Sequence, residues 1–122
     1  MIINEIRLAL QLYFDVMHEC DLEKFDCIFH PASSLFNAKD GVLTLRSFAK
    51  YRTEIENRIS PKSLGQPRID SILAIDVLSP EMCFAKVRVR IHEKIFIDNL
   101  NLLKIDGRWM IVAKIYHHVD TV

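Results

Sequence analysis

Apolar residues in the first part of the chain recur every three or four positions, the period of a helix with one buried face. In the first predicted helix this face holds Ile3, Ile6, Leu10, Tyr13, Phe14 and Met17. Asp21 stands where an N-cap belongs, and it predicts a second helix that ends before Pro31. Its apolar positions are Leu22, Phe25, Ile28 and Phe29. Thr44 is the expected cap of a third helix. Its apolar stripe is Phe48, Tyr51, Ile55 and Ile59.

The rest of the chain follows a period of two, which is typical of strands. A short strand is expected over 33–38, followed by a turn at Lys39, Asp40 and Gly41. Beyond Arg68, four long strands are predicted at about 69–78, 82–92, 95–106 and 108–119. Helices followed by a meander predict an α+β fold, with three N-terminal helices packed on one face of an antiparallel sheet. No repeat or linker interrupts the chain, so a single domain over 1–122 is expected.

The dipeptide Asp106-Gly107 is the strongest hairpin signal in the chain. A two-residue turn there predicts that Ile105 pairs with Arg108 and that Asp98 pairs with Ile115. One face of this hairpin is then expected to hold Phe96, Asp98, Leu100 and Leu102 opposite Trp109, Ile111, Ala113, Ile115 and His117. A second turn at Glu93-Lys94 adds Ala85, Val87, Val89 and Ile91 to this face. The other face is expected to be mixed, with Arg88, Arg90, His92, Asn99, Asn101, Lys114 and Tyr116.

Asp98 is the most informative residue of this pattern, because a carboxyl group among apolar side chains must be neutral, paired or hydrogen-bonded. His117 is predicted to lie diagonally across the ladder from Asp98, about 7–8 Å away, within reach of its carboxyl group. The alternative is structural: Asp98 only hydrogen-bonds a buried backbone group or His117, and His117 lies near the end of its strand in water.

Composition excludes several classes of protein. The 16 basic and 16 acidic residues among 122 give no net positive charge, which argues against nucleic acid as a partner. No apolar run approaches the roughly 20 residues of a membrane-spanning helix, so no membrane association is expected. Cys20, Cys27 and Cys83 form no paired motif and fit a reducing cytoplasm. No cluster has metal-ligand spacing, and no glycine-rich phosphate loop is present, so neither a metal nor a cofactor is expected.

Two segments, YFDVMHECDLEKFDCIFHP and FIDNLNLLKIDGRWMIVAKIY, resemble the lumazine-binding, SnoaL-like branch of the nuclear transport factor 2-like superfamily. The resemblance covers nearly the whole chain. It implies a cone-shaped, cystatin-like fold in which three helices wrap a curved sheet around an internal pocket. It also implies a homodimer formed through the outer sheet face, where Arg88, Asn101 and Tyr116 are expected.

The superfamily includes ketosteroid isomerase, in which a tyrosine and a protonated aspartic acid form an oxyanion hole. In the resemblance, Tyr13 matches that tyrosine and Asp98 matches that acid, so both are expected to donate to a ligand oxygen. Asn37 falls at the position of the catalytic base, and an amide cannot accept a proton, which argues against steroid isomerisation. His30, beside the break at Pro31, is the nearest substitute.

Three functions follow from these observations. The leading hypothesis is a binding pocket for a small apolar or planar molecule, lined by Tyr13, His30, Asn37, Asp98, Trp109 and His117. The second is an isomerase, cyclase or dehydratase, with His30 as the base and with Tyr13 and Asp98 stabilising an enolate-like anion. The third is a non-catalytic dimerisation module whose cone is filled by its own phenylalanine side chains.

Overall fold

The chain folds into three helices and a six-stranded sheet, described over residues 1–122 by a computed structural model. The helices are α1 (Ile2–Glu19), α2 (Leu22–Ile28) and α3 (Phe48–Asn57). The strands are β1 (Phe29–Lys39), β2 (Val42–Ser47), β3 (Asp70–Ser79), β4 (Met82–Ile91), β5 (Lys94–Ile105) and β6 (Arg108–Thr121). None of the helices has the length and the apolar character needed to cross a membrane.

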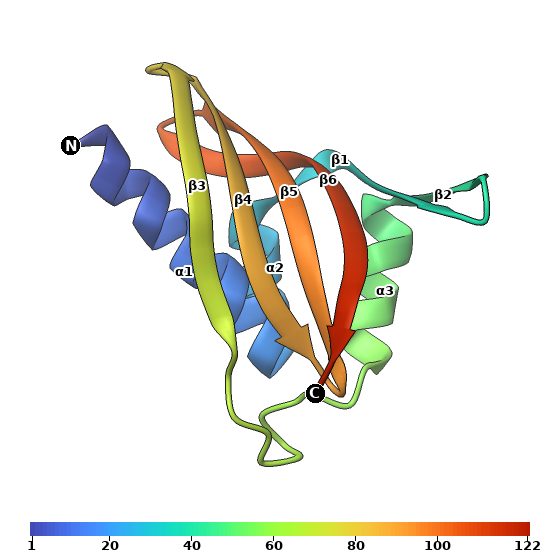
Figure 1. Cartoon of the computed structure of the whole chain (residues 1–122). Helices are drawn as coiled ribbons and strands as arrows, with labels where there is room; N and C mark the ends of the chain where they lie inside the picture. Colours follow the sequence, from blue (N-terminus) through green and yellow to red (C-terminus); the bar gives the residue numbers. More distant parts are fainter.

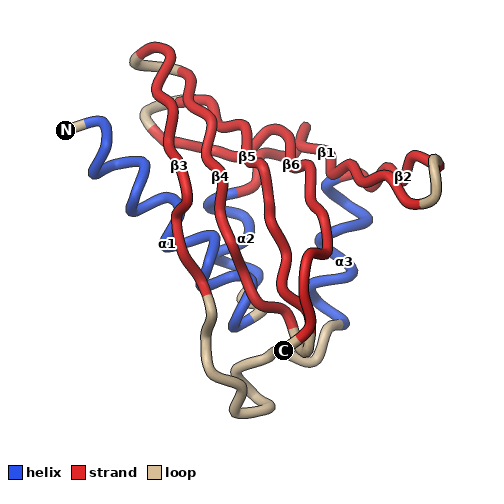
Figure 2. The backbone as a smooth tube through the Cα atoms, viewed as in Figure 1, coloured by secondary structure: helices blue, strands red, loops and turns tan.

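The strands form one twisted sheet in the order β2-β1-β6-β5-β4-β3, and all three helices lie against the same side of it (Figure 1). This arrangement confirms the predicted packing of helices on one sheet face. The short strand predicted over 33–38 lies within β1, but the prediction did not include β2, which pairs with β1 in a hairpin between α2 and α3. β1 joins the sheet parallel to β6, so the sheet is not purely antiparallel. Figure 2 shows this hairpin extending past α3 at one side of the molecule.

Side-chain caps fix where the two shorter helices begin. Asp21 accepts a hydrogen bond from the N–H of Lys24 at 3.1 Å, which confirms it as the cap of α2. The cap of α3 is Ser47, which accepts from the N–H of Lys50 at 3.2 Å. The prediction of Thr44 as this cap is wrong, because Thr44 lies within β2, opposite Asn37 in the ladder.

The hairpin between β5 and β6 forms as predicted at its turn. Asp106 and Gly107 both have positive φ values, 49° and 78°, and Ile105 pairs with Arg108. Farther along the ladder the register changes. Asn101 pairs with Ala113 and Leu102 pairs with Ile111, so Val112 is an extra residue in β6 that forms a β-bulge.

This bulge overturns the predicted faces of β6. Because side chains alternate along a strand, one inserted residue exchanges the two faces of everything that follows it. Asp98 therefore pairs with Tyr116 rather than with Ile115, and Lys114 is buried opposite Leu100. Ile115 is 50% exposed on the outer face.

The β4–β5 turn also lies one residue earlier than predicted, at His92-Glu93, because Ile91 pairs with Lys94. This shift preserves the alternation of β4. Ala85, Val87 and Val89 are buried against the helices, as expected. They pack in one core with the buried face of α1, which holds Ile6, Leu10, Tyr13, Phe14 and Met17.

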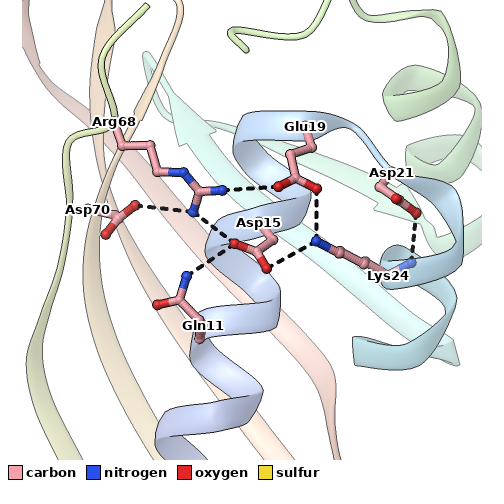
Figure 3. A network of polar contacts seen from close by, with 7 residues as sticks. All are labelled: Gln11, Asp15, Glu19, Asp21, Lys24, Arg68 and Asp70. Carbon is pink, nitrogen blue, oxygen red and sulfur yellow. Dashed lines mark hydrogen bonds and ion pairs between the residues drawn. The ribbon is translucent and has the colours of Figure 1, made fainter.

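A network of charged side chains on the opposite face of α1 ties this helix to α2 and to the start of β3 (Figure 3). Arg68 lies 2.8 Å from Asp15 and 3.2 Å from Glu19, and Lys24 bridges the same two carboxylates at 3.2 and 2.9 Å. Partial burial is the largest influence on the Asp15 carboxyl group and opposes its ionisation. Hydrogen bonds from Arg68, Gln11 and Lys24 outweigh burial, so the pKa of Asp15 is lowered.

Candidate functional site

Tyr13 on α1 and Asp98 on β5 meet in the interior, where both are fully buried. The Tyr13 hydroxyl donates a hydrogen bond to Oδ2 of Asp98. Oδ1 of Asp98 is buried and has no hydrogen-bond partner. Since buried polar atoms are almost always satisfied, this oxygen marks a position where a partner belongs.

Lys114 on β6 is the third member of this group, and it is 3% exposed. Its Nζ lies 3.6 Å from Oδ2 of Asp98 and donates a hydrogen bond of 3.3 Å to the hydroxyl of Tyr51 on α3. Nζ also lies 5.2 Å from the ring centroids of both Tyr13 and Tyr51. An ion pair, a hydrogen bond and two aromatic faces therefore compensate the desolvation of a buried ammonium group.

The surroundings of Tyr13 keep its hydroxyl protonated. Burial raises the pKa of Tyr13 well above its usual value, and the neighbouring Asp98 carboxylate raises it further. Tyr13 therefore acts as a hydrogen-bond donor to Asp98 across the neutral pH range. Because its proton is directed at Oδ2, the tyrosine orients the carboxyl group and leaves Oδ1 as the free atom.

A cavity lies beside this group, lined by residues of β2 and α3, the end of β4, the first half of β5 and the second half of β6. It has room of about 50 Å³ for the centres of water molecules, and the space unfilled by atoms is about 290 Å³, including the part open to solvent. One water needs roughly 10–15 Å³ by the first measure, so the cavity holds several waters or a small organic molecule. Its lining is Arg46, Tyr51, Arg58, Ile91, Phe96, Asp98, Lys114 and Tyr116.

Two arginines line this cavity, and their environments differ. Arg46 on β2 forms an ion pair with Glu54 and donates a hydrogen bond to the Tyr116 hydroxyl. Its guanidinium carbon also lies 5.1 Å from the Tyr116 ring centroid, which fixes both side chains in the wall. Arg58 follows the last turn of α3 and is half-buried. Its Nη1 is buried without a hydrogen-bond partner.

A second cleft of about 390 Å³ shares Phe96 and Tyr116 with the cavity, so these two aromatic residues line both spaces. Their centroids lie 6.2 Å apart in an edge-to-face arrangement. The remaining lining of this outer cleft is Asn37, Ala38, Lys39, Lys94, His117 and His118. Of the six residues predicted for the pocket, Asn37 therefore lies in the outer cleft rather than beside Asp98.

Three other predicted residues lie away from the cavity. His30 is not part of the cavity lining, and its Nδ1 accepts from the N–H of Ala32 at 3.0 Å. Trp109 is buried near the start of β6, beside a separate groove. The prediction that His117 approaches Asp98 is wrong: the bulge at Val112 places His117 opposite Ile97, on the exposed face of β6.

The sequence patterns missed most of the polar residues that the structure brings to Asp98. Tyr51 was visible only as one position of an apolar stripe, although a tyrosine among buried residues needs a partner for its hydroxyl. Lys114 and Tyr116 were predicted on the outer face because no residue type in β6 indicates the bulge. Arg46 and Arg58 come from element ends, where periodicity carries little information. The described side chains include no group of three or more histidine, cysteine, aspartate or glutamate residues arranged to hold a metal ion.

Comparison with known proteins places this geometry in context. The family described as "Putative lumazine-binding" matches residues 2–117. The aldolase FrzH of a Cladobotryum species is 26% identical over 107 residues, which are 86% of this chain and 82% of the aldolase.

Solved structures share the whole fold. A nuclear transport factor 2-like protein from Silicibacter pomeroyi superposes with a TM-score of 0.84 at 20% identity, covering 96% of this chain and 95% of its own. Another, from Shewanella baltica, superposes with a TM-score of 0.83 at 26% identity, covering 96% of this chain and 93% of its own.

Proposed function

Because this chain belongs to the "Putative lumazine-binding" family of nuclear transport factor 2-like domains, we propose that the cavity beside Asp98 binds a small molecule. The observation that carries the proposal is Asp98, which lines the cavity and whose buried Oδ1 has no hydrogen-bond partner. A hydrogen bond from a ligand to this oxygen contributes more binding free energy than one to an exposed carboxylate, because the oxygen has already lost its water on folding.

Tyr13 and Asp98 have different roles in the proposed binding site. Tyr13 holds the carboxyl group in one orientation, and Asp98 contacts the ligand. Ile91, Phe96 and Tyr116 supply apolar and planar surface for the body of the ligand. The site is therefore suited to a compact planar or apolar molecule with one polar atom that contacts Asp98.

Filling the cavity tests this proposal. Ile91→Trp places an indole in the space, and Leu78→Trp is the matched control, since Leu78 is 73% exposed at the far end of the sheet. Crystals of the purified protein and mass spectrometry of its extracts are compared for the three proteins. We expect a bound molecule within hydrogen-bond distance of Asp98 in the wild type and the control, and none in Ile91→Trp. A cavity closed by Phe96 and Tyr116 in the crystal favours the dimerisation module instead.

An enzymatic role in the same cavity is the second candidate, favoured by the similarity to an aldolase over most of the chain. Aldol and isomerase chemistry both begin by removing a proton beside a carbonyl group, which forms an enolate. With His30 outside the cavity, Asp98 takes the place of the base, and the Lys114 ammonium group stabilises the enolate oxygen.

Deuterium exchange tests this second candidate. The protein is incubated with acetophenone in deuterium oxide, and loss of the methyl proton signal is followed by NMR. Exchange faster than in buffer, and lost in Asp98→Asn, supports the enzyme. Exchange at the buffer rate contradicts the enzymatic role, and the cavity-filling variant then decides whether the protein binds a small molecule.

A further inference from the structure

Positive charge is concentrated around the cavity, although the chain as a whole carries 16 basic and 16 acidic residues. The lining includes three cations, Arg46, Arg58 and Lys114, and one carboxylate, Asp98. Such an excess in a partly enclosed space produces a local potential that the balanced total charge conceals.

Two of the three cations already have a counter-charge. Lys114 is paired with Asp98 at 3.6 Å, and Arg46 is paired with Glu54. Arg58 forms no ion pair, and its buried Nη1 has no hydrogen-bond acceptor. Asp98 in the lining and Glu54 outside it therefore balance two of the three cations, and the remaining positive charge lies on Arg58.

The outer cleft continues the same charge distribution toward the surface. Beyond the shared rings of Phe96 and Tyr116, its ionisable lining consists of Lys39, Lys94 and two histidines, and it includes no carboxylate. An anion in this cleft, next to the cavity, therefore meets a favourable potential. A neutral ligand gains nothing from that arrangement.

We propose that the ligand is a small organic monocarboxylate whose carboxylate group is bound by Arg58. This inference rests on the proposed binding function and adds the chemical class of the ligand. Guanidinium N–H groups match a carboxylate in a two-bond arrangement, and a single negative charge balances the single unpaired cation. A phosphate monoester carries more negative charge than the cavity lacks and is the less favoured anion. The unpartnered Oδ1 of Asp98 then accepts from a hydroxyl or N–H group elsewhere on the same ligand.

Isothermal titration calorimetry with benzoate and benzyl alcohol tests the inference, because the two differ in charge but share a planar ring. Ionic strength is kept constant with sodium chloride. We expect benzoate to bind the wild type at least about tenfold more tightly than benzyl alcohol does. Arg58→Gln should remove this preference. Arg7→Gln, which removes an exposed arginine from α1, should retain it. Arg58→Lys keeps the charge without the planar fork and should retain part of the preference.

The outcomes separate the inference from the function on which it rests. Equal binding of benzoate and benzyl alcohol, both lost in Ile91→Trp, overturns the carboxylate inference and leaves the binding function intact. Preference for benzoate that survives in a folded Arg58→Gln protein also overturns it. No binding of either probe, together with a closed cavity in the crystal, overturns both. Circular dichroism of each variant shows whether the fold is retained.

Discussion

Replacing Asp98 with leucine tests whether the buried carboxylate and the buried ammonium group depend on each other. The two side chains are 1% and 4% exposed, so neither charge is solvated by bulk water. Asp98→Leu leaves the Lys114 ammonium group buried without its counter-charge and the Tyr13 hydroxyl without its acceptor. Breaking one side of a buried pair costs about 3–5 kcal/mol, and the orphaned hydroxyl contributes within that range.

The double variant Asp98→Leu with Lys114→Met separates this dependence from simple loss of packing. Replacing both members of a buried pair by apolar residues of similar volume is often neutral or stabilising. We therefore expect the double variant to be less destabilised than Asp98→Leu alone. The difference between the double variant and the sum of the two single variants should be about 2–3 kcal/mol.

Urea denaturation followed by circular dichroism and by the fluorescence of Trp109, the single tryptophan, measures these differences. With a slope of about 1–3 kcal/mol per M, a loss of about 3 kcal/mol lowers the midpoint by about 1–3 M. An unchanged midpoint in Asp98→Leu refutes the reasoning, because Lys114 then does not depend on the carboxylate. A change in slope rather than midpoint points to an altered denatured state instead.

Two further predictions concern the surface. The pKa of Asp15 is lowered in the folded state, so its contribution to stability is complete above the unfolded value near pH 4 and is lost as the pH falls through the folded value. Arg68→Ala should flatten the acid limb of a stability-against-pH profile below about pH 4, and an unchanged limb contradicts this assignment. We also predict a homodimer through the outer sheet face, where Ile115 is 50% exposed between its ladder partners Phe36 and Asn99. Light scattering should show dimers for the wild type and monomers for Ile115→Glu, whereas a monomeric wild type contradicts the interface.

Tyr13 and Asp98 could be predicted as site residues because the sequence patterns that identify them do not depend on the exact strand register. Tyr13 belongs to a helical stripe repeated over five turns, and Asp98 stands among alternating apolar residues in a long strand. The turn at Asp106-Gly107 has a backbone requirement that few dipeptides meet, so its position was also fixed by chemistry. Each of these signals is local and redundant.

The remaining wall of the cavity depends on features with no comparable local signal. Arg46 and Arg58 reach the cavity because β2 and α3 end beside it, which only the packing of the β1–β2 hairpin determines. His30 was expected to turn inward at the break before Pro31. Instead the chain passes directly from α2 into β1, and the Nδ1 of His30 accepts a hydrogen bond from the N–H of Ala32 outside the cavity.

The bulge at Val112 connects these observations, since one inserted residue builds much of the site. Without it, Ile115 would face Asp98, and Lys114 and Tyr116 would lie on the outer face. Asp98 would then be a buried carboxylate with a tyrosine as its only polar neighbour, a state that desolvation strongly disfavours. With the bulge, Lys114 supplies the counter-charge and Tyr116 supplies a cavity wall held by Arg46. The alternation of β6 alone is compatible with either arrangement. The buried Asp98 favours the bulged one, because that register brings the Lys114 ammonium group within 3.6 Å of its carboxyl group.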